Sequence, residues 1–231
     1  MSAPDIQVLD DPAARAADVL AEAASAGRHI VLTGGSTPRS AYEQAAAKGA
    51  DWSRAEIWFG DERCVPPEHE HSNFGMANAA LLSKIQPKAV RRMKGELGPQ
   101  GGARDYQQQL DDAFGKGFLP EFGLLLLGIG PDAHVASLFP GDAALGEQTK
   151  TVVGVETPGM APLVSRISLT LPVINAADQV VFLISGEDKA EAVARAFGGL
   201  RPGPDAPASL VRPEPGTLTV LLDAAAAKHV S

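Results

Sequence analysis

The sequence predicts an α/β protein: one domain over residues 1–231, with an open, mostly parallel, Rossmann-like sheet and helices on both faces. Strand-like and helix-like segments alternate along the chain, which is typical of parallel βαβ units. The most apolar run, Leu124 to Leu127, is short and bounded by glycines, as expected for a strand buried on both faces. The proline-rich stretch from Arg201 to Gly216 lies between strand and helix signals, so we interpret it as a long loop.

Each element is predicted from a short apolar run or from an alanine-rich segment with a stop signal. Residues 12–26 form such a segment and end at Gly27, and Pro38 to Lys48 end at Gly49, which indicates two helices with C-terminal glycines. Strands are predicted at His29–Leu32, Glu56–Phe59, Leu124–Leu127, Arg166–Leu169, Val180–Ile184 and Leu218–Leu222. Further helices are predicted at Asn73–Ile85, Arg104–Phe114, Lys189–Phe197 and Asp223–His229.

Composition excludes several classes of protein. The formal net charge of −8 argues against a broad nucleic-acid-binding surface, although a small anionic substrate remains compatible with a few local cations. Cys64 is the single cysteine, so no intrachain disulfide forms, which fits a reducing compartment. The acidic N-terminus is unlike a signal peptide, and no run approaches the ~20 apolar residues of a membrane helix. We therefore expect a cytoplasmic protein without membrane or nucleic-acid partners.

The first motif, residues 33–38 (TGGSTP), joins a strand to a helix. Gly34 and Gly35 allow a tight turn and a close approach of the backbone to a ligand. Thr37 suits the N-cap and Pro38 the first helical position, and the helix start, with Ser36, presents N–H groups to an anion. A well-capped helix without a ligand is the alternative. Neither a Walker motif nor a dinucleotide fingerprint is present.

The second motif, residues 60–67 (GDERCVPP), places three charges directly after a strand. Arg63 could hold a phosphate through its planar guanidinium, or it could form a surface ion pair with Glu62. The nearby residues 69–71 (HEH) resemble metal ligands, but consecutive loop residues do not provide a preorganised tetrahedral set. We therefore expect no metal site.

The third motif, residues 128–141, follows the apolar strand and contains Asp132 and His134. In open α/β sheets, ligands bind beyond the carboxyl ends of the strands, and a histidine there can act as a general base near neutral pH. The alternative is that Asp132 caps a helix and His134 is a solvated residue of its first turn.

Two further cations are candidate anion ligands. Lys189 begins a predicted helix, where the helix dipole disfavours a cation unless it shares an anion with the helix terminus. Arg166 begins a predicted strand and is either an anion ligand or a solvated edge residue. The four motifs together predict a pocket for a small phosphorylated molecule. No motif for a nucleophilic side chain is visible, so water activated by His134 is the expected nucleophile.

The ordered motifs resemble the 6-phosphogluconolactonase family, within the glucosamine/galactosamine-6-phosphate isomerase superfamily. The resemblance runs from Gly34 to Lys189, and its most specific part is residues 136–140 (ASLFP) after the histidine. It implies hydrolysis of a phosphorylated sugar lactone, 6-phospho-D-glucono-1,5-lactone, to 6-phosphogluconate in the oxidative pentose phosphate pathway, without metal or organic cofactor. The sequence leaves monomer and homodimer open.

The resemblance also implies a role for each site residue. His134 would activate water for attack on the lactone carbonyl, and Asp132 would orient the site. Arg63 and Lys189 would bind the phosphate, residues 34–37 would line the site, and Arg166 would assist at the phosphate or at the developing oxyanion. Relatives usually have glycine between the aspartate and the histidine, where this chain has Ala133. If that position needs a positive φ, alanine costs about 1 kcal/mol.

Two alternatives differ in sequence from this chain. Glucosamine-6-phosphate deaminases are similar up to the histidine but then carry an acid that helps to open the sugar ring, whereas residues 137–140 (SLFP) contain none. The second alternative is a non-catalytic sugar-phosphate-binding domain. As the sensing domain of a transcription regulator it would need a DNA-binding module, and no helix-turn-helix fits the acidic N-terminal residues. A binder without catalytic activity would not need both Asp132 and His134, which this chain retains.

Overall fold

A computed structural model describes residues 3–230 and contains a central seven-stranded sheet. All strand pairings in this sheet are parallel, in the order β1-β10-β9-β6-β2-β3-β5. The apolar side chains of the inner strands are buried on both faces, as the unbroken run in β6 predicts. The strands are β1 (Asp5–Val8), β2 (His29–Leu32), β3 (Glu56–Phe59), β5 (Ala89–Val90), β6 (Leu124–Leu127), β9 (Gln179–Ile184) and β10 (Thr217–Leu222).

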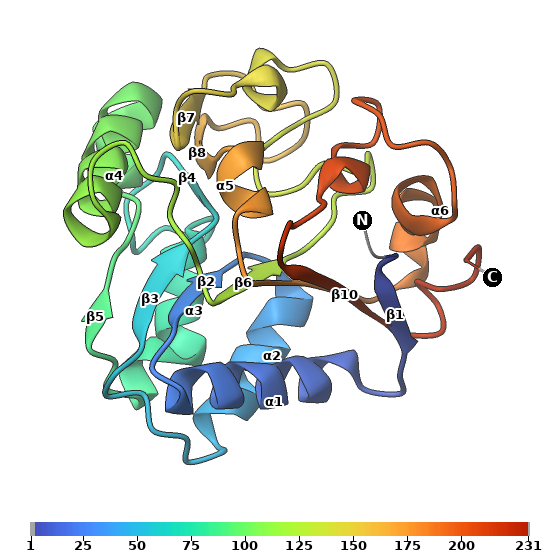
Figure 1. The fold of residues 1–231 in the computed structure, drawn as a ribbon, viewed down its shortest axis with the longest axis horizontal. Coiled ribbons are helices and arrows are strands. Elements are labelled where there is room, and N and C mark those ends of the chain that lie inside the picture. The colour runs from blue at the N-terminus through green and yellow to red at the C-terminus, as the bar shows by residue number, and fades with distance from the viewer. Residues whose placement is uncertain (1–2, 231) are drawn as a thin grey trace.

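Helices cover both faces of the sheet, which confirms the predicted fold class (Figure 1). Helices α1, α2 and α3 lie on one face, where α1 packs against α2 and α2 against α3. Helices α4, α5 and α6 lie on the other. Their bounds are α1 (Pro12–Ser25), α2 (Ser36–Ala46), α3 (Asn73–Ala80), α4 (Gly98–Phe114), α5 (Leu171–Asn175) and α6 (Ala190–Phe197), with 3-10 turns at Leu82–Lys84, Gly95–Leu97, Ala143–Gly146, Glu187–Lys189 and Pro207–Leu210.

A second, antiparallel sheet lies beside the first and was not predicted. Its strands, in the order β4-β8-β7, are β4 (Asp61–Arg63), β8 (Arg166–Leu169) and β7 (Val152–Val155). The predicted strand at Arg166–Leu169 therefore exists but belongs to this smaller sheet. It sits on the same face as α4 and α5, above the ends of β2 and β3 (Figure 1).

Several of the predictions for individual elements are wrong. Strand β1 was not predicted, and α4 begins at Gly98 rather than at the predicted Arg104. The predicted helix at Asp223–His229 is a series of turns, although the Asp223 carboxylate accepts from the Ala226 backbone N–H at 2.7 Å, as an N-cap residue would. The same carboxylate accepts from the Gly186 backbone N–H at 3.0 Å. Asp223 thus ties the end of β10 to the loop that follows β9.

The order of the strands creates a crevice between β2 and β6. From β2 the chain moves outward to β3 and β5, then returns to β6 on the other side of β2 and continues to β9 and β10. Connections leaving the carboxyl ends of β2 and β6 therefore diverge to opposite faces. Ligands of open α/β sheets bind at this kind of reversal.

Two buried tyrosines hold the ends of the strands that lead to this crevice. The Tyr42 hydroxyl accepts from the backbone N–H of Thr33 and donates to its carbonyl, both at 2.8 Å. The Tyr106 hydroxyl contacts the N–H and carbonyl of Phe59 at 2.8 and 3.1 Å in the same way. Desolvation raises the pKa of both phenols. These contacts satisfy backbone groups where the sheet ladder stops, and they fix the loops that follow.

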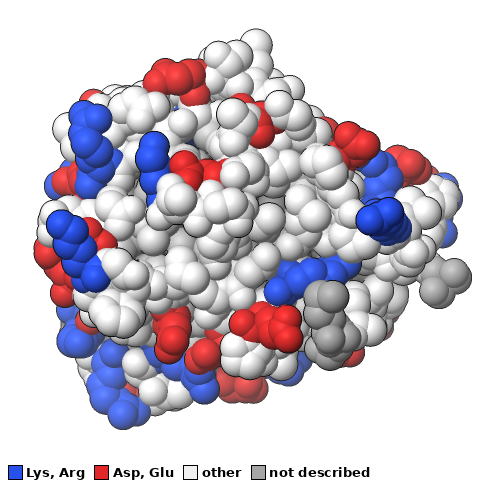
Figure 2. Space-filling view, turned by 45° about the horizontal axis from the view of Figure 1, so that its top comes forward, with Lys and Arg blue, Asp and Glu red and all other residues white. Residues whose placement is uncertain are grey.

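Charged side chains on the face shown in Figure 2 lie mostly around the periphery, with both signs mixed. That face presents no continuous basic field of the kind that a nucleic-acid backbone requires. Within residues 3–230, no helix is both long and apolar enough to cross a membrane.

Candidate active site

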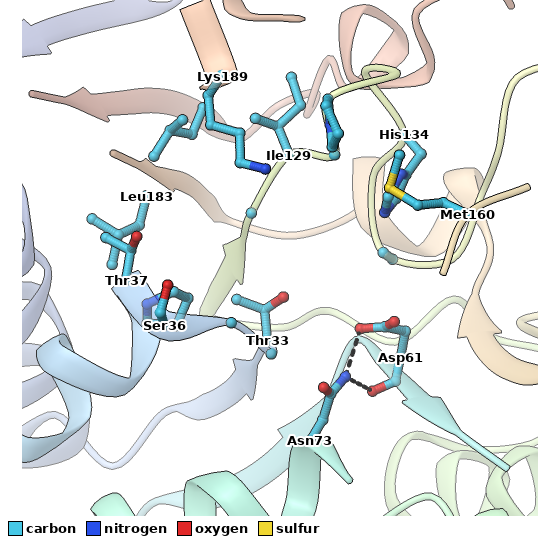
Figure 3. A pocket seen from close by; sticks show the side chains of 18 of the residues that line it. Thr33, Ser36, Thr37, Asp61, Asn73, Ile129, His134, Met160, Leu183 and Lys189 are labelled. Atoms are coloured by element: carbon cyan, nitrogen blue, oxygen red, sulfur yellow. Dashed lines mark hydrogen bonds between the residues drawn. The ribbon is translucent and has the colours of Figure 1, made fainter. Parts of the chain in front are cut away.

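A cavity of about 260 Å³ lies at the carboxyl ends of the sheet strands, at the reversal between β2 and β6. It collects residues from five separate parts of the chain (Figure 3). All the predicted site residues except Asp132 line it, and Asp132 lies behind His134. The predicted residues that line the cavity are Gly34, Gly35, Ser36, Thr37, Arg63, His134, Arg166 and Lys189.

The glycine-rich turn delivers the start of α2 to the cavity. The helix begins at Ser36, and the N-cap is Gly35, whose φ of 120° is a conformation that favours glycine. The predicted N-cap, Thr37, is wrong by two residues, and no side chain caps this helix. The N–H groups of its first turn therefore have no side-chain acceptor and remain available to an anion.

Asp132 and His134 form a hydrogen-bonded pair. The distance from His134 Nδ1 to Asp132 Oδ1 is 2.6 Å, and the same oxygen accepts from the His134 backbone at 3.1 Å. Desolvation acts to raise the pKa of Asp132, but the hydrogen bond and charge of His134 outweigh it, so the pKa lies below its usual value. An ionised Asp132 selects the tautomer with the proton on Nδ1, which leaves the Nε2 lone pair for the cavity.

The turn between the two residues settles where His134 points. Ala133 has a φ of +67° and is fully buried, so the left-handed turn is kept although the residue is not glycine. Its N–H donates to Gly130 at 2.8 Å, and its carbonyl accepts from Ala208 at 3.0 Å. Asp132 caps no helix here, and the loop from Arg201 to Gly216 supports this turn from behind through Ala208.

We predict that Ala133→Gly leaves the orientation of His134, and any activity that depends on it, unchanged. The turn already has the left-handed conformation, so glycine removes strain without moving His134. Relief of strain and the added entropy of the unfolded chain nearly cancel, which keeps the free energy of unfolding within about 1 kcal/mol of the parent protein. Steady-state kinetics and urea unfolding measure both quantities. A clear gain in kcat would instead mean that alanine misdirects the histidine.

Arg63 and Arg166 face each other across two neighbouring strands. They are register partners in the β4–β8 pair, and both line the cavity. Arg63 donates to the His71 carbonyl at 2.7 Å, while its buried Nε has no hydrogen-bond partner among residues 3–230. This leaves a guanidinium N–H for a ligand.

Arg166 is buried rather than a solvated edge residue. It is 3% exposed and donates to the carbonyls of Pro162 and Val164 at 2.9 and 3.1 Å. Burial and the nearby charge of Arg63 lower its pKa. Arg166 therefore holds the segment that carries Met160 over the cavity, in addition to lending positive charge to it.

Lys189 ends the 3-10 turn before α6 and extends into the cavity opposite Ser36 and Thr37 (Figure 3). Its Nζ lies 3.1 Å from the exposed carboxylate of Asp188. The sequence predicted a shared anion at the start of the helix that Lys189 begins, whereas in the structure the side chain faces the start of α2, where an anion could bind both.

Sequence reasoning missed the contacts of three buried polar residues in and shortly after the second motif, which are Asp61, Glu62 and Asn73. Glu62 forms no ion pair with Arg63; instead it accepts from the backbone N–H groups of Asn73 and Phe74, at 2.7 and 2.8 Å, and so anchors the start of α3. Desolvation raises its pKa in spite of these donors. Asp61 and Asn73 line the cavity and are hydrogen-bonded to each other at 3.1 Å. The two-residue period of a strand, which places residues 61 and 63 on one face, could have indicated Asp61.

No other group competes for a chemical role in the described part of the chain. Residues 69–71 lie outside the cavity, and no group of three or more His, Cys, Asp or Glu side chains within residues 3–230 is arranged to hold a metal ion. Cys64 is half-buried, and desolvation raises the pKa of its thiol, which disfavours the reactive thiolate.

Fold and cavity together define a class of protein: an α/β protein with a cation-lined cavity at the reversal of a parallel sheet, beside a histidine–aspartate pair. Residues 6–220 match the family described as glucosamine-6-phosphate isomerases/6-phosphogluconolactonase. The chain belongs to this family, which confirms the resemblance found in its motifs.

Known proteins are similar to this chain over most of its length. The 6-phosphogluconolactonase of Streptomyces coelicolor is 41% identical over 224 residues, which cover 91% of this chain and 85% of that protein. The human 6-phosphogluconolactonase is 40% identical over 187 residues, or 80% of this chain and 71% of that protein. The crystal structure of 6-phosphogluconolactonase from Leishmania guyanensis has a TM-score of 0.86 at 29% identity and covers 100% of both chains.

Proposed function

We propose that this protein is an enzyme that hydrolyses 6-phospho-D-glucono-1,5-lactone to 6-phospho-D-gluconate, a step of the oxidative pentose phosphate pathway. The observation that carries the proposal is His134, held by Asp132 in a cavity that three cations and an uncapped helix start make suitable for a phosphorylated ligand. Relatives named as 6-phosphogluconolactonases at about 40% identity support the choice of substrate.

In the proposed mechanism, His134 Nε2 accepts a proton from a water molecule as the water oxygen attacks the lactone carbonyl. The Asp132 carboxylate stabilises the imidazolium that forms. The tetrahedral intermediate then collapses, the bond between the carbonyl carbon and the ring oxygen breaks, and His134 returns the proton to that oxygen. The product is the open-chain acid, and the histidine is again neutral.

The phosphate is proposed to bind Arg63 and Lys189 together with the N–H groups of residues 34–37. The N–H groups at the start of α2 and the flexible ammonium group of Lys189 both suit a phosphate. The Nε–H of Arg63, which has no partner among the described residues, supplies a further donor. Arg166 adds charge at the phosphate or at the oxyanion of the intermediate. Its guanidinium is largely engaged by backbone carbonyls, so its contribution is electrostatic.

The test is the hydrolysis of freshly generated 6-phosphogluconolactone, coupled to 6-phosphogluconate dehydrogenase, with and without the protein. The uncatalysed opening of the lactone is subtracted. We expect a rate well above this background, and no release of ammonia from glucosamine 6-phosphate. Ammonia release without lactonase activity would refute the proposal in favour of the deaminase alternative.

We also propose that residues 1–231 act as one sugar-phosphate lactonase domain in the cytoplasm, as a monomer or homodimer. One continuous hydrophobic core joins the two sheets and supports a single domain. Hydrolysis by water requires neither a redox nor a group-transfer cofactor.

A further inference from the structure

Asp61 is the one carboxylate that lines the cavity among the described residues, and the proposed reaction does not use it. Its neighbours in the lining include Arg63, Arg166 and Lys189, and Asp61 itself is 5% exposed. A carboxylate in a cavity for a phosphorylated ligand repels that ligand, so it reduces phosphate affinity. A favourable interaction between the Asp61 carboxylate and another part of the ligand would offset this repulsion.

The side chain of Asp61 is fixed in place from two sides. Ser137 Oγ donates to Oδ2 at 2.7 Å, and Asn73 Nδ2 donates to Oδ1 at 3.1 Å. Ser137 is itself buried, and its backbone N–H donates to Ser168 Oγ at 3.2 Å. Asn73 packs so closely on Gly34 that a Cβ at Gly34 would lie 2.0 Å from its Oδ1. Asp61 therefore cannot turn away from the cavity without disturbing both partners.

The carboxylate keeps acceptor capacity toward the cavity. An ionised carboxylate offers about four acceptor sites, and two side-chain donors occupy part of them. A ligand that matches the remaining capacity must donate a hydrogen bond. The donors on a phosphorylated sugar lactone are the hydroxyl groups of its ring.

The place of Asp61 in the cavity determines which hydroxyl groups of a bound lactone lie near its carboxylate. Figure 3 shows Lys189, Ser36 and Thr37 toward one end of the cavity, and Asp61 with His134 toward the other. A lactone with its phosphate at the first end and its carbonyl near His134 places the hydroxyls nearest the carbonyl beside Asp61.

We propose that Asp61 is a specificity residue that accepts a hydrogen bond from the 2- or 3-hydroxyl of the bound lactone. This rests on the proposed function, because the substrate's orientation follows from it. The same contact would orient the ring so that the carbonyl faces the water activated by His134.

The test combines one substitution with two altered substrates. Parent protein and Asp61→Asn are assayed with 6-phosphogluconolactone and with its 2-deoxy and 3-deoxy analogues. A hydrogen bond to a buried charge is worth about 10- to 100-fold, so Asp61→Asn should lower kcat/KM for the full substrate by this factor. With the analogue that lacks the contacted hydroxyl, the substitution should cause little further loss. The intrinsic reactivity of each lactone cancels in this comparison.

The proposal would be overturned if Asp61→Asn lowered kcat/KM for both deoxy analogues by the same factor as for the full substrate. The same comparison of dissociation constants for 6-phosphogluconate and its deoxy forms, by calorimetry, needs no turnover. Coupling in binding with an inactive parent protein would therefore refute the lactonase function but not the contact. Ser137→Ala keeps the carboxylate and removes one anchor, so it should retain part of the discrimination; it decides the question if Asp61→Asn does not fold.

Discussion

Replacing His134 with alanine is expected to reduce kcat for lactone hydrolysis by about 10²- to 10⁴-fold, the usual contribution of a general base. The side chain is proposed to contribute its Nε2 lone pair to the reaction and its Nδ1 proton to Asp132. Its ring packs on Phe139, with centroids 4.5 Å apart, outside the continuous hydrophobic core. The variant should therefore fold and bind 6-phosphogluconate as the parent protein does. Stopped-flow or coupled kinetics and calorimetry measure the two quantities.

The control is His229→Ala, which removes an exposed histidine outside the cavity and should change neither quantity. Near-normal turnover of His134→Ala would remove the histidine from its proposed role. Loss of binding together with loss of turnover would mean that His134 holds the substrate rather than activates water.

Replacing Arg63 with alanine should raise KM by about 10- to 100-fold and leave kcat largely unchanged. A charge-assisted hydrogen bond to phosphate is lost, but the phosphate is remote from the bond that breaks. Binding energy that is equal in the ground state and the transition state appears in KM alone. Initial rates over a wide range of lactone concentration separate the two parameters.

Arg28→Ala is the matched control, because it removes the same charge at the amino end of β2, opposite the cavity, where Arg28 pairs with Asp178 at 3.1 Å. A fall confined to kcat in Arg63→Ala would contradict the phosphate assignment. It would place the guanidinium at the developing oxyanion, next to its register partner Arg166.

The parallel sheet could be predicted because its strands are apolar runs buried on both faces. The predicted bounds of the strands at Glu56–Phe59 and Leu124–Leu127 agree with β3 and β6, where hydrophobic burial alone decides the conformation. Strand β4 could not be predicted in this way. Its three residues are Asp61, Glu62 and Arg63, and they are extended because they pair with β8, far along the chain.

The same distinction explains the site. The glycines, Arg63 and His134 were found because they lie in the segments that leave predicted strands, whereas Lys189 and Arg166 were found as cations at the start of a predicted helix and a predicted strand. The environment of Asp61 was not, because it depends on Ser137 and Asn73, which meet only in the folded protein. The side chain of Asp223 also bonds to Gly186 in a distant loop, and local propensity, which predicted a helix at Asp223–His229, cannot include that contact.

The pairing of β2 with β6, in which Ile30 lies opposite Leu124, has a consequence for synthesis of the protein. When β2, β3 and β5 have been synthesised, only the β2 side of the crevice exists, because β6 comes later in the chain. Lys189 is synthesised later still. An N-terminal piece that ends before Lys189 lacks part of the proposed binding site. We therefore expect activity to report completion of the long-range sheet rather than formation of any local helix. During synthesis, the glycine turn and Arg63 are made before His134, so the proposed phosphate ligands are present before the proposed catalytic residue.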